Sequence, residues 1–255
     1  KVTVSVLYWR TRYGGGSELV SCPVNKKRMP MLRRAAKGVA AGLVGLGAFA
    51  AYHAPDALRH WDDIAEVDVD PGSIFDAAPV TTSTSSSSPA AAVACKDCYE
   101  IVVPTRDFRG GQVPGFTREA AMIEFVRSFY TAPLFSVERY LIAAASLSLP
   151  ASVEEESFHV GRKLEGWEVI THQPHGISTA WGDVQGVHGT TNFAVRRGPT
   201  AGHMTVRFGS TLSGCEVSAP MLALHDAYSR VLLSQAVATL ERRGAAANGD
   251  LTTPL

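Results

Sequence analysis

Two cysteines separated by two residues, Cys95 and Cys98, are the first residues of this chain whose types and spacing could do chemistry. A Cys-x-x-Cys pair can be half of a zinc site or the redox pair of a thioredoxin-like motif. A zinc site needs a second ligand pair, but the other cysteines, Cys22 and Cys215, are isolated. A redox pair lies between a strand and a helix, whereas this one precedes the strand-like run 99–103. The pattern favours two thiols that are idle or oxidised to each other.

Histidines are the second group of candidates. His172 and His175 lie on a proline-containing turn with no carboxylate at metal-ligand spacing, which favours solvated side chains over a metal site. His225 lies one turn from Tyr228 on a predicted helix, where it could act as a general acid or base in a cleft. A lone histidine at the edge of an apolar stripe is more often a hydrogen-bonded structural residue. The sequence therefore favours a structural His225.

Motifs that would identify a nucleotide-binding or hydrolytic enzyme are missing from the sequence. It contains no P-loop, no Gly-x-Gly-x-x-Gly run between a strand and a helix, and no Gly-x-Ser-x-Gly elbow. Basic and acidic residues number 24 each, so the net charge of zero does not point to a nucleic-acid partner. We expect no catalytic residue, no metal site, no cofactor and no nucleic acid, and an enzyme is the least favoured class.

The element that must position His225 is a helix predicted from Ser218 to Arg243. Ser218 can cap the amides of its first turn, and an apolar stripe follows at helical spacing. The stripe consists of Leu224, Tyr228, Val231 and Leu232. Basic residues in the last turn suit the helix dipole, and Gly244 is typical of a helix stop. We expect residues 244–255 to be a disordered tail.

A sheet is predicted in front of this helix, between Trp167 and Leu212. Apolar residues there alternate with polar ones in four runs joined by short turns, which indicates an antiparallel meander. Trp181, Phe193 and Phe208 lie on the apolar face, which needs a cover. The helix that follows is the available cover.

Two further helices precede the meander. The first begins at the cap Thr117 and carries an aromatic stripe that ends at Tyr130, and the second covers about 134–147. With the strand at 99–103, these elements predict an α+β domain over residues 95–243. Its antiparallel β-sheet would be covered by a long C-terminal helix and a helical pair.

The N-terminal third has a different composition. Residues 1–30 show no clear organisation. Residues 31–55 contain basic residues followed by the uncharged Ala/Gly-rich run Gly38–Tyr52. This hydrophobic helix could be a single-pass membrane anchor, a cleaved presequence for secretion or an organelle, or a buried helix. Residues 56–94 are acidic and then Ser/Pro/Ala-rich, which predicts a disordered linker.

Three stretches carry a resemblance to a known superfamily. They are FYTAPLFSVER (Phe129–Arg139), RFGS (Arg207–Ser210) and HDAYSRVLL (His225–Leu233). Through them the chain resembles a set of uncharacterised proteins whose order of elements is similar to the START or polyketide-cyclase-like helix-grip superfamily. The resemblance covers about residues 99–240. It implies a lipid or other apolar ligand held between the sheet and the long helix.

The function that the sequence favours is therefore a membrane-tethered domain, without catalysis, that binds an apolar small molecule or lipid. The expected lining residues are Tyr130, Trp181, Phe193, Phe208, Tyr228 and, as a polar fixing point, His225. One alternative is a membrane-associated interaction or assembly protein with a filled core. The other is an enzyme that uses His225 as acid or base, which needs a carboxylate or hydroxyl within hydrogen-bond reach of His225 inside a cleft.

Overall fold

The computed structural model describes residues 53–76, 93–145, 149–150, 152–153, 158–184, 187–213 and 217–247. The predicted hydrophobic helix at 38–52 and most of the Ser-rich linker lie outside these residues. Contacts divide the chain into two compact units, Lys1–Pro55 and Asp56–Leu255, and the fold described below is that of the second unit. Within the described ranges, no helix combines the length and the apolar character needed to cross a bilayer.

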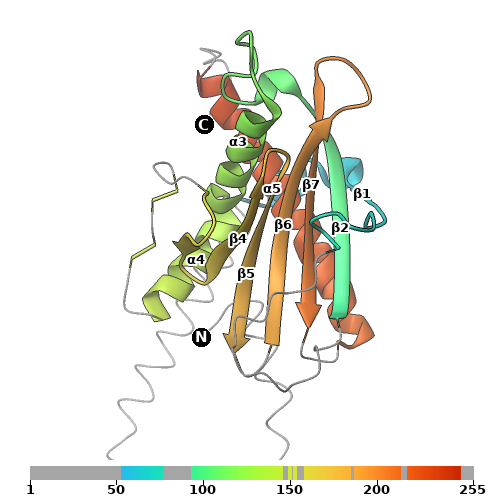
Figure 1. Cartoon of the computed structure of the whole chain (residues 1–255), viewed down its shortest axis with the longest axis vertical. Coiled ribbons are helices and arrows are strands. Elements are labelled where there is room, and N and C mark those ends of the chain that lie inside the picture. The colour runs from blue at the N-terminus through green and yellow to red at the C-terminus, as the bar shows by residue number, and fades with distance from the viewer. Residues whose placement is uncertain are drawn as a thin grey trace, which may run out of the picture. The chain divides into compact units, whose positions relative to one another are not determined.

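The second unit is built on one antiparallel sheet of seven strands (Figure 1). In chain order the strands are β1 (Ala65–Glu66), β2 (Val93–Pro104), β3 (Lys163–Leu164), β4 (Trp167–Gln173), β5 (Gly176–Val184), β6 (Val187–Arg197) and β7 (His203–Ser213). Their order across the sheet is β1-β2-β7-β6-β5-β4-β3. The first long strand, β2, therefore lies beside the last, β7. The predicted four-stranded meander is confirmed as β4 to β7, and the predicted strand at 99–103 is part of the longer β2.

Three long helices accompany the sheet: α3 (Arg118–Thr131), α4 (Pro133–Ala145) and α5 (Ala219–Ala247). The Thr117 side chain accepts a hydrogen bond from the Ala120 amide at 3.1 Å, so α3 begins at the predicted cap. Pro133 begins α4 rather than kinking one long helix, because a proline at the first helical position loses no hydrogen bond. Figure 1 shows the three helices on one face of the sheet. The predicted α+β class is thus present.

Helix α5 is longer than the sequence predicts, and its buried part begins farther along the helix than expected. It continues through Gly244 to Ala247 instead of stopping at Arg243. A Cβ atom at Gly244 would lie 2.1 Å from the Asp107 carbonyl oxygen, so this glycine permits close packing against the short helix η3 (Thr105–Asp107). Leu224, expected on the buried stripe, is 49% exposed, and burial begins near Ser229.

The acidic segment expected to be a linker is partly folded. Residues 61–63 form the short helix η2, and β1 pairs with β2. Phe75 is 2% exposed and packs with Cys98 and Ala194 on the sheet face opposite the helices. Gly209 makes room for this ring, since a Cβ there would lie 2.9 Å from Phe75 Cδ1. The folded unit therefore begins well before Cys95, because a few apolar side chains in this acidic segment pack against the sheet.

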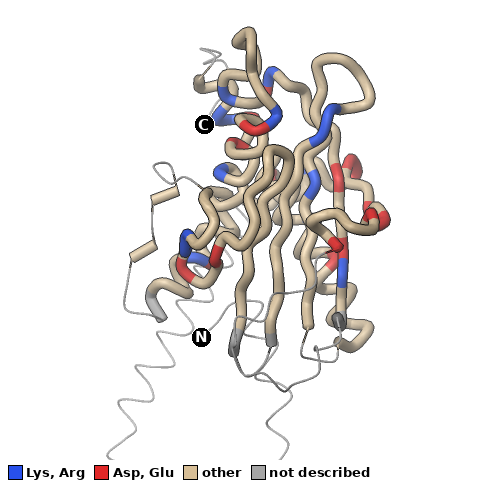
Figure 2. Tube along the Cα trace, in the orientation of Figure 1, with Lys and Arg blue, Asp and Glu red and all other residues tan. Residues whose placement is uncertain are grey.

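Two arginines of the sheet hold the same segment by charge. The Asp70 carboxylate accepts hydrogen bonds from Arg196 at 2.7 Å and from Arg207 at 2.9 Å. Arg207 also donates to Glu100 at 2.8 Å. These bonds lower the pKa of Asp70, with the hydrogen bond from Arg196 as the largest cause. Figure 2 shows acidic residues gathered along this segment, beside β1 and β2.

Candidate functional site

The aromatic residues expected to line a ligand cavity are part of a filled core. Tyr130, Phe193 and Phe208 are at most 3% exposed. The ring of Phe129, from α3, has its centroid 4.9 Å from those of both Phe193 and Phe208. Phe135, from α4, lies 4.7 Å from Phe129 by the same measure. Side chains of the protein itself thus occupy the space between sheet and helices where the sequence predicts a ligand.

Trp181 and Tyr228, the other two aromatic candidates, pack at the margin of this core. The indole ring of Trp181 lies over Gly189, where a Cβ atom would be 2.1 Å from the ring. The Tyr228 hydroxyl donates a hydrogen bond to Glu138 Oε2 at 2.5 Å and ties α5 to α4. Burial, helped by the Glu138 charge, raises the pKa of Tyr228 well above its ordinary value. Tyr228 therefore acts as a neutral hydrogen-bond donor between two helices.

His225 lies apart from the aromatic rings, near the start of α5, in a polar cluster. Its Nε2 lies 2.6 Å from Asp97 Oδ2 on β2 and 2.9 Å from Ser210 Oγ on β7. A carboxylate and a hydroxyl therefore both lie within hydrogen-bond reach of His225, although the enzyme alternative requires only one of them, inside a cleft, and His225 does not line the cleft described below. A Ser-His-Asp triad, however, needs serine and carboxylate on different imidazole nitrogens. Here both partners meet Nε2, so the geometry is not that of a triad.

Asp97 is the fixed centre of this cluster. Its side chain is 6% exposed, and Oδ1 accepts a hydrogen bond from the Ser210 backbone amide at 2.6 Å. The Ser210 hydroxyl lies within 3.3 Å of both carboxylate oxygens. These bonds replace the water that a carboxylate loses on burial and direct Oδ2 toward His225. Sequence reasoning missed Asp97 and Ser210 because only the pairing of β2 with β7 brings residues this far apart together.

The two cysteines of the Cys-x-x-Cys motif lie on opposite faces of β2. In a strand, side chains three residues apart point to opposite sides of the sheet. Cys98 is buried with Phe75 on the outer face, whereas Cys95 shares the inner face with Asp97 and His225, where the three possible ligand atoms lie within 4.8 Å of one another. Neither cysteine forms a disulfide. Burial raises the pKa of the Cys98 thiol to about 12. The motif is therefore two separate thiols in different surroundings, and the suggestion that they oxidise to each other does not fit a strand.

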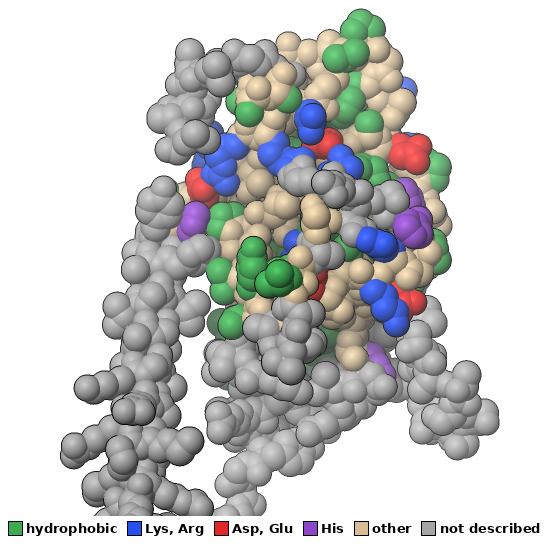
Figure 3. All heavy atoms as spheres, turned by 90° about the vertical axis from the view of Figure 1, so that its left-hand side faces the viewer, with side chains coloured by type: hydrophobic (Ala, Val, Ile, Leu, Met, Phe, Trp, Pro, Cys, Tyr) green, Lys and Arg blue, Asp and Glu red, His purple; other side chains and the backbone are tan. Residues whose placement is uncertain are grey.

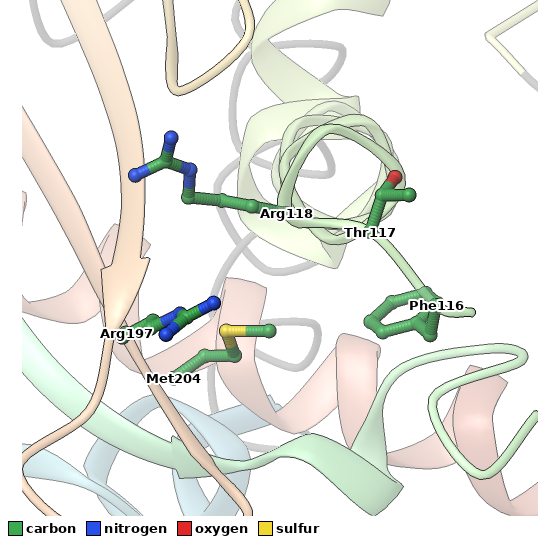
Figure 4. A pocket seen from close by; sticks show the side chains of 5 residues that line it. All are labelled: Phe116, Thr117, Arg118, Arg197 and Met204. Atoms are coloured by element: carbon green, nitrogen blue, oxygen red, sulfur yellow. The ribbon is translucent and has the colours of Figure 1, made fainter. Parts of the chain in front are cut away.

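A cleft of about 430 Å³ lies farther along the inner face. It is lined by Phe116, Thr117, Arg118, Arg197 and Met204. Figure 4 shows the Phe116 ring facing the Met204 thioether across the cleft, with the Arg197 guanidinium beside Met204 and the Arg118 side chain extending above them with its guanidinium directed away from both. The cleft is thus lined by two apolar side chains and two cationic ones.

The β6–β7 hairpin and the start of α3 form this cleft. Arg197 ends β6 and Met204 is the second residue of β7, and the Gly198 amide closes the hairpin by donating to the His203 carbonyl at 2.9 Å. Phe116 and Arg118 flank the cap Thr117 on the facing helix. None of the six lining residues expected from sequence belongs to the cleft. The helix cap and the Gly-Pro turn are visible in the sequence, but their proximity is not.

Comparison with known proteins adds no identification: no protein-family model matches the chain, and no curated protein matches it significantly.

Proposed function

We propose that this protein is a binding domain, without catalysis, for a lipid that has an acyl chain and an anionic headgroup. The single observation that carries the proposal is the cleft between α3 and the β6–β7 hairpin. Its volume of about 430 Å³ is in the range of small-molecule pockets, about 300–1,000 Å³. Such pockets are mostly apolar and contain a few polar groups that orient the ligand.

The chemistry of the lining residues supports this ligand class. Phe116 and Met204 supply apolar surface, and a methionine side chain adapts its shape to flexible chains. Arg118 and Arg197 supply two guanidinium groups, which bind carboxylate or phosphate through paired hydrogen bonds. A neutral apolar molecule would leave both cations without a role, so an anionic headgroup is the better match.

The order of the elements is compatible with the helix-grip resemblance. The long strand β2, two helices, a meander and a long final helix follow one another, and β2 pairs with β7. The ligand position differs from the expectation, since the centre of the grip is filled by Phe129 and its neighbours. The membrane tether at Gly38–Tyr52 belongs to this proposal on composition alone.

A binding titration of the purified full chain tests the proposal. Oleate is the probe, oleyl alcohol is the neutral match, and acetate is the headgroup without the chain. We expect oleate to bind at one site, oleyl alcohol at least about tenfold more weakly, and acetate not detectably. Met204→Trp fills the cleft and should weaken oleate at least tenfold. Arg118→Gln/Arg197→Gln should bring oleate and oleyl alcohol to similar affinity.

Lys163→Gln is the matched control for charge. Lys163 is an exposed cation with a side chain 75% exposed, on β3 and outside the cleft. This variant should bind oleate as the wild type does. If oleate fails to bind, or binds Met204→Trp as tightly as the wild type, the proposal is wrong.

A second candidate is an interaction or assembly domain, and the filled core favours it. Exposed apolar residues on the helices include Tyr140, Leu141, Leu222 and Leu224. On the face shown in Figure 3, hydrophobic side chains are interspersed with basic ones. A chain that binds no oleate but co-purifies with one partner protein in constant ratio, and loses it on Tyr140→Glu/Leu141→Glu, would support this candidate instead.

A further inference from the structure

We propose that Cys95, Asp97 and His225 form a binding site for a Zn²⁺ ion. The proposal is independent of the lipid cleft. Along β7, Ser210 beside this site and Met204 in the cleft are six residues apart, which is about 20 Å of strand. One function can therefore fail while the other holds.

The chemistry of the three side chains selects the metal. Cysteine sulfur, imidazole nitrogen and carboxylate oxygen are the three ligand types that zinc takes in proteins. The possible ligand atoms of Cys95, Asp97 and His225 lie within 4.8 Å of one another. Calcium and magnesium prefer sites made only of oxygen, so the thiol excludes them.

The distance between the nitrogen and oxygen ligands requires only a small adjustment. Tetrahedral zinc with bonds of about 2.0 Å separates its nitrogen and oxygen ligands by about 3.3 Å. His225 Nε2 and Asp97 Oδ2 lie 2.6 Å apart and contact each other directly, with no atom other than a hydrogen between them. A zinc ion entering between them would replace the shared proton and move the two atoms apart by less than 1 Å. His225 can make this movement because its side chain is 32% exposed on the first turns of α5.

Groups that hold the ligands are already in place. Ser210 binds Asp97 Oδ1 through its amide and approaches both carboxylate oxygens with its hydroxyl. This is the outer contact that orients a metal-binding carboxylate. Cys95 and Asp97 are two residues apart in β2, so both side chains point to its inner face. One strand therefore positions two of the three ligands.

Three protein ligands leave the fourth position of a tetrahedral zinc ion open. Structural zinc sites are closed by four protein ligands, whereas three ligands and an open position are typical of sites that bind water or an exogenous group. The His225 side chain is 32% exposed, so this edge of the site is in contact with solvent. We therefore assign an open zinc site rather than a structural one.

Titration of the metal-free full chain with Zn²⁺ against a chromophoric chelator tests this site. We expect one high-affinity zinc per chain that excess Mg²⁺ does not displace. Cys95→Ala and His225→Gln should each weaken binding by more than about 100-fold, because changes in outer contacts alone cost about 10- to 100-fold. Ser210→Ala should fall within that smaller range. Co²⁺ in place of zinc should give a thiolate-to-cobalt charge-transfer band in the wild type that Cys95→Ala lacks.

Cys98→Ala is the matched control, since Cys98 lies on the same strand but on the opposite face. It should bind zinc as the wild type does and keep the cobalt band. Circular dichroism of each variant separates loss of a ligand from loss of the fold, and His225→Gln, on a partly exposed position, covers the case in which Cys95→Ala does not fold. The proposal is overturned if the wild type binds no zinc, if its cobalt form lacks the charge-transfer band, or if Cys98→Ala weakens binding as much as Cys95→Ala.

Discussion

The guanidinium of Arg139 donates two hydrogen bonds to the carboxylate of Glu165, at 2.7 and 3.0 Å, and joins α4 to the β3–β4 turn. Both side chains are almost fully buried, at 6% and 4% exposure. Glu165 has a φ of 51°, and among the described residues it is the one non-glycine with a positive φ. A left-handed backbone at a glutamate is sparsely populated, so the contacts of its side chain compensate for the strain.

Replacement of Arg139 should therefore destabilise the protein strongly. Arg139→Ala leaves the buried Glu165 without the cation that neutralises it and also removes a donor to the Tyr130 carbonyl. Breaking a buried ion pair from one side costs about 3–5 kcal/mol. Urea denaturation measures the change. Lys163→Ala is the control: its ion pair with Glu168 is exposed, and it should cost less than about 1 kcal/mol. Equal losses from the two variants would show that the buried pair has no special role.

Phe129 should be among the most sensitive positions of the core. It is 1% exposed and contacts Phe135, Phe193 and Phe208. Phe129→Ala opens a cavity among these rings and should lower the free energy of unfolding by about 3–5 kcal/mol. Thermal and urea unfolding measure it. Tyr140→Ala, on a side chain that is 60% exposed, should stay within about 0.5 kcal/mol. A small loss for Phe129→Ala would mean that the space between sheet and helices is not tightly packed.

Stability at alkaline pH should depend on Cys98. Burial raises the pKa of this thiol from 9.0 to about 12. Between these values the unfolded chain loses the proton while the folded chain keeps it, so stability falls as pH rises. Below pH 9 the contribution of Cys98 is fully present.

Comparison of Cys98→Ala with the wild type measures this effect. Between pH 8 and pH 10, the urea midpoint of unfolding should fall less for Cys98→Ala than for the wild type. Val103→Ala, a buried change on the same strand without a titrating group, should keep the wild-type pH dependence. Identical pH dependence for Cys98→Ala and the wild type would contradict the raised pKa of the Cys98 thiol.

Attachment of the segment 65–76 should weaken in acid. Arg196 and Arg207 lower the pKa of Asp70 through hydrogen bonds, so the contribution of this carboxylate is present above the usual carboxyl range and is lost as pH falls through its folded-state pKa. Asp70→Asn should increase hydrogen exchange of the β1 amides at neutral pH, and the difference from wild type should shrink in acid. Asp68→Asn, on an exposed neighbour, is the control and should exchange as the wild type does. Exchange that is unchanged in Asp70→Asn would exclude these ion pairs as the attachment.

The sequence alone determined the elements that have a strong local signal. Alternating apolar residues predicted the meander of β4 to β7, and Thr117 with the following aromatic stripe predicted α3. These signals depend on periodicity and capping, which are properties of neighbouring residues. Where a tertiary contact overrides the local signal, the prediction failed. Gly244 continues α5 because it packs on Asp107, and Phe75 draws an acidic segment onto the sheet.

Only the tertiary structure decided the candidate sites. Whether Phe193 and Phe208 face a ligand or another ring depends on the position of α3, and the sequence does not give the distance between a helix and a sheet. The pairing of β2 with β7 places Asp97 next to Ser210, which are 113 residues apart, and α5 adds His225. The cleft likewise joins the start of α3 to a distant hairpin. Spacing along a chain predicts which face of one element a side chain occupies, but the meeting of side chains from several elements is set by packing.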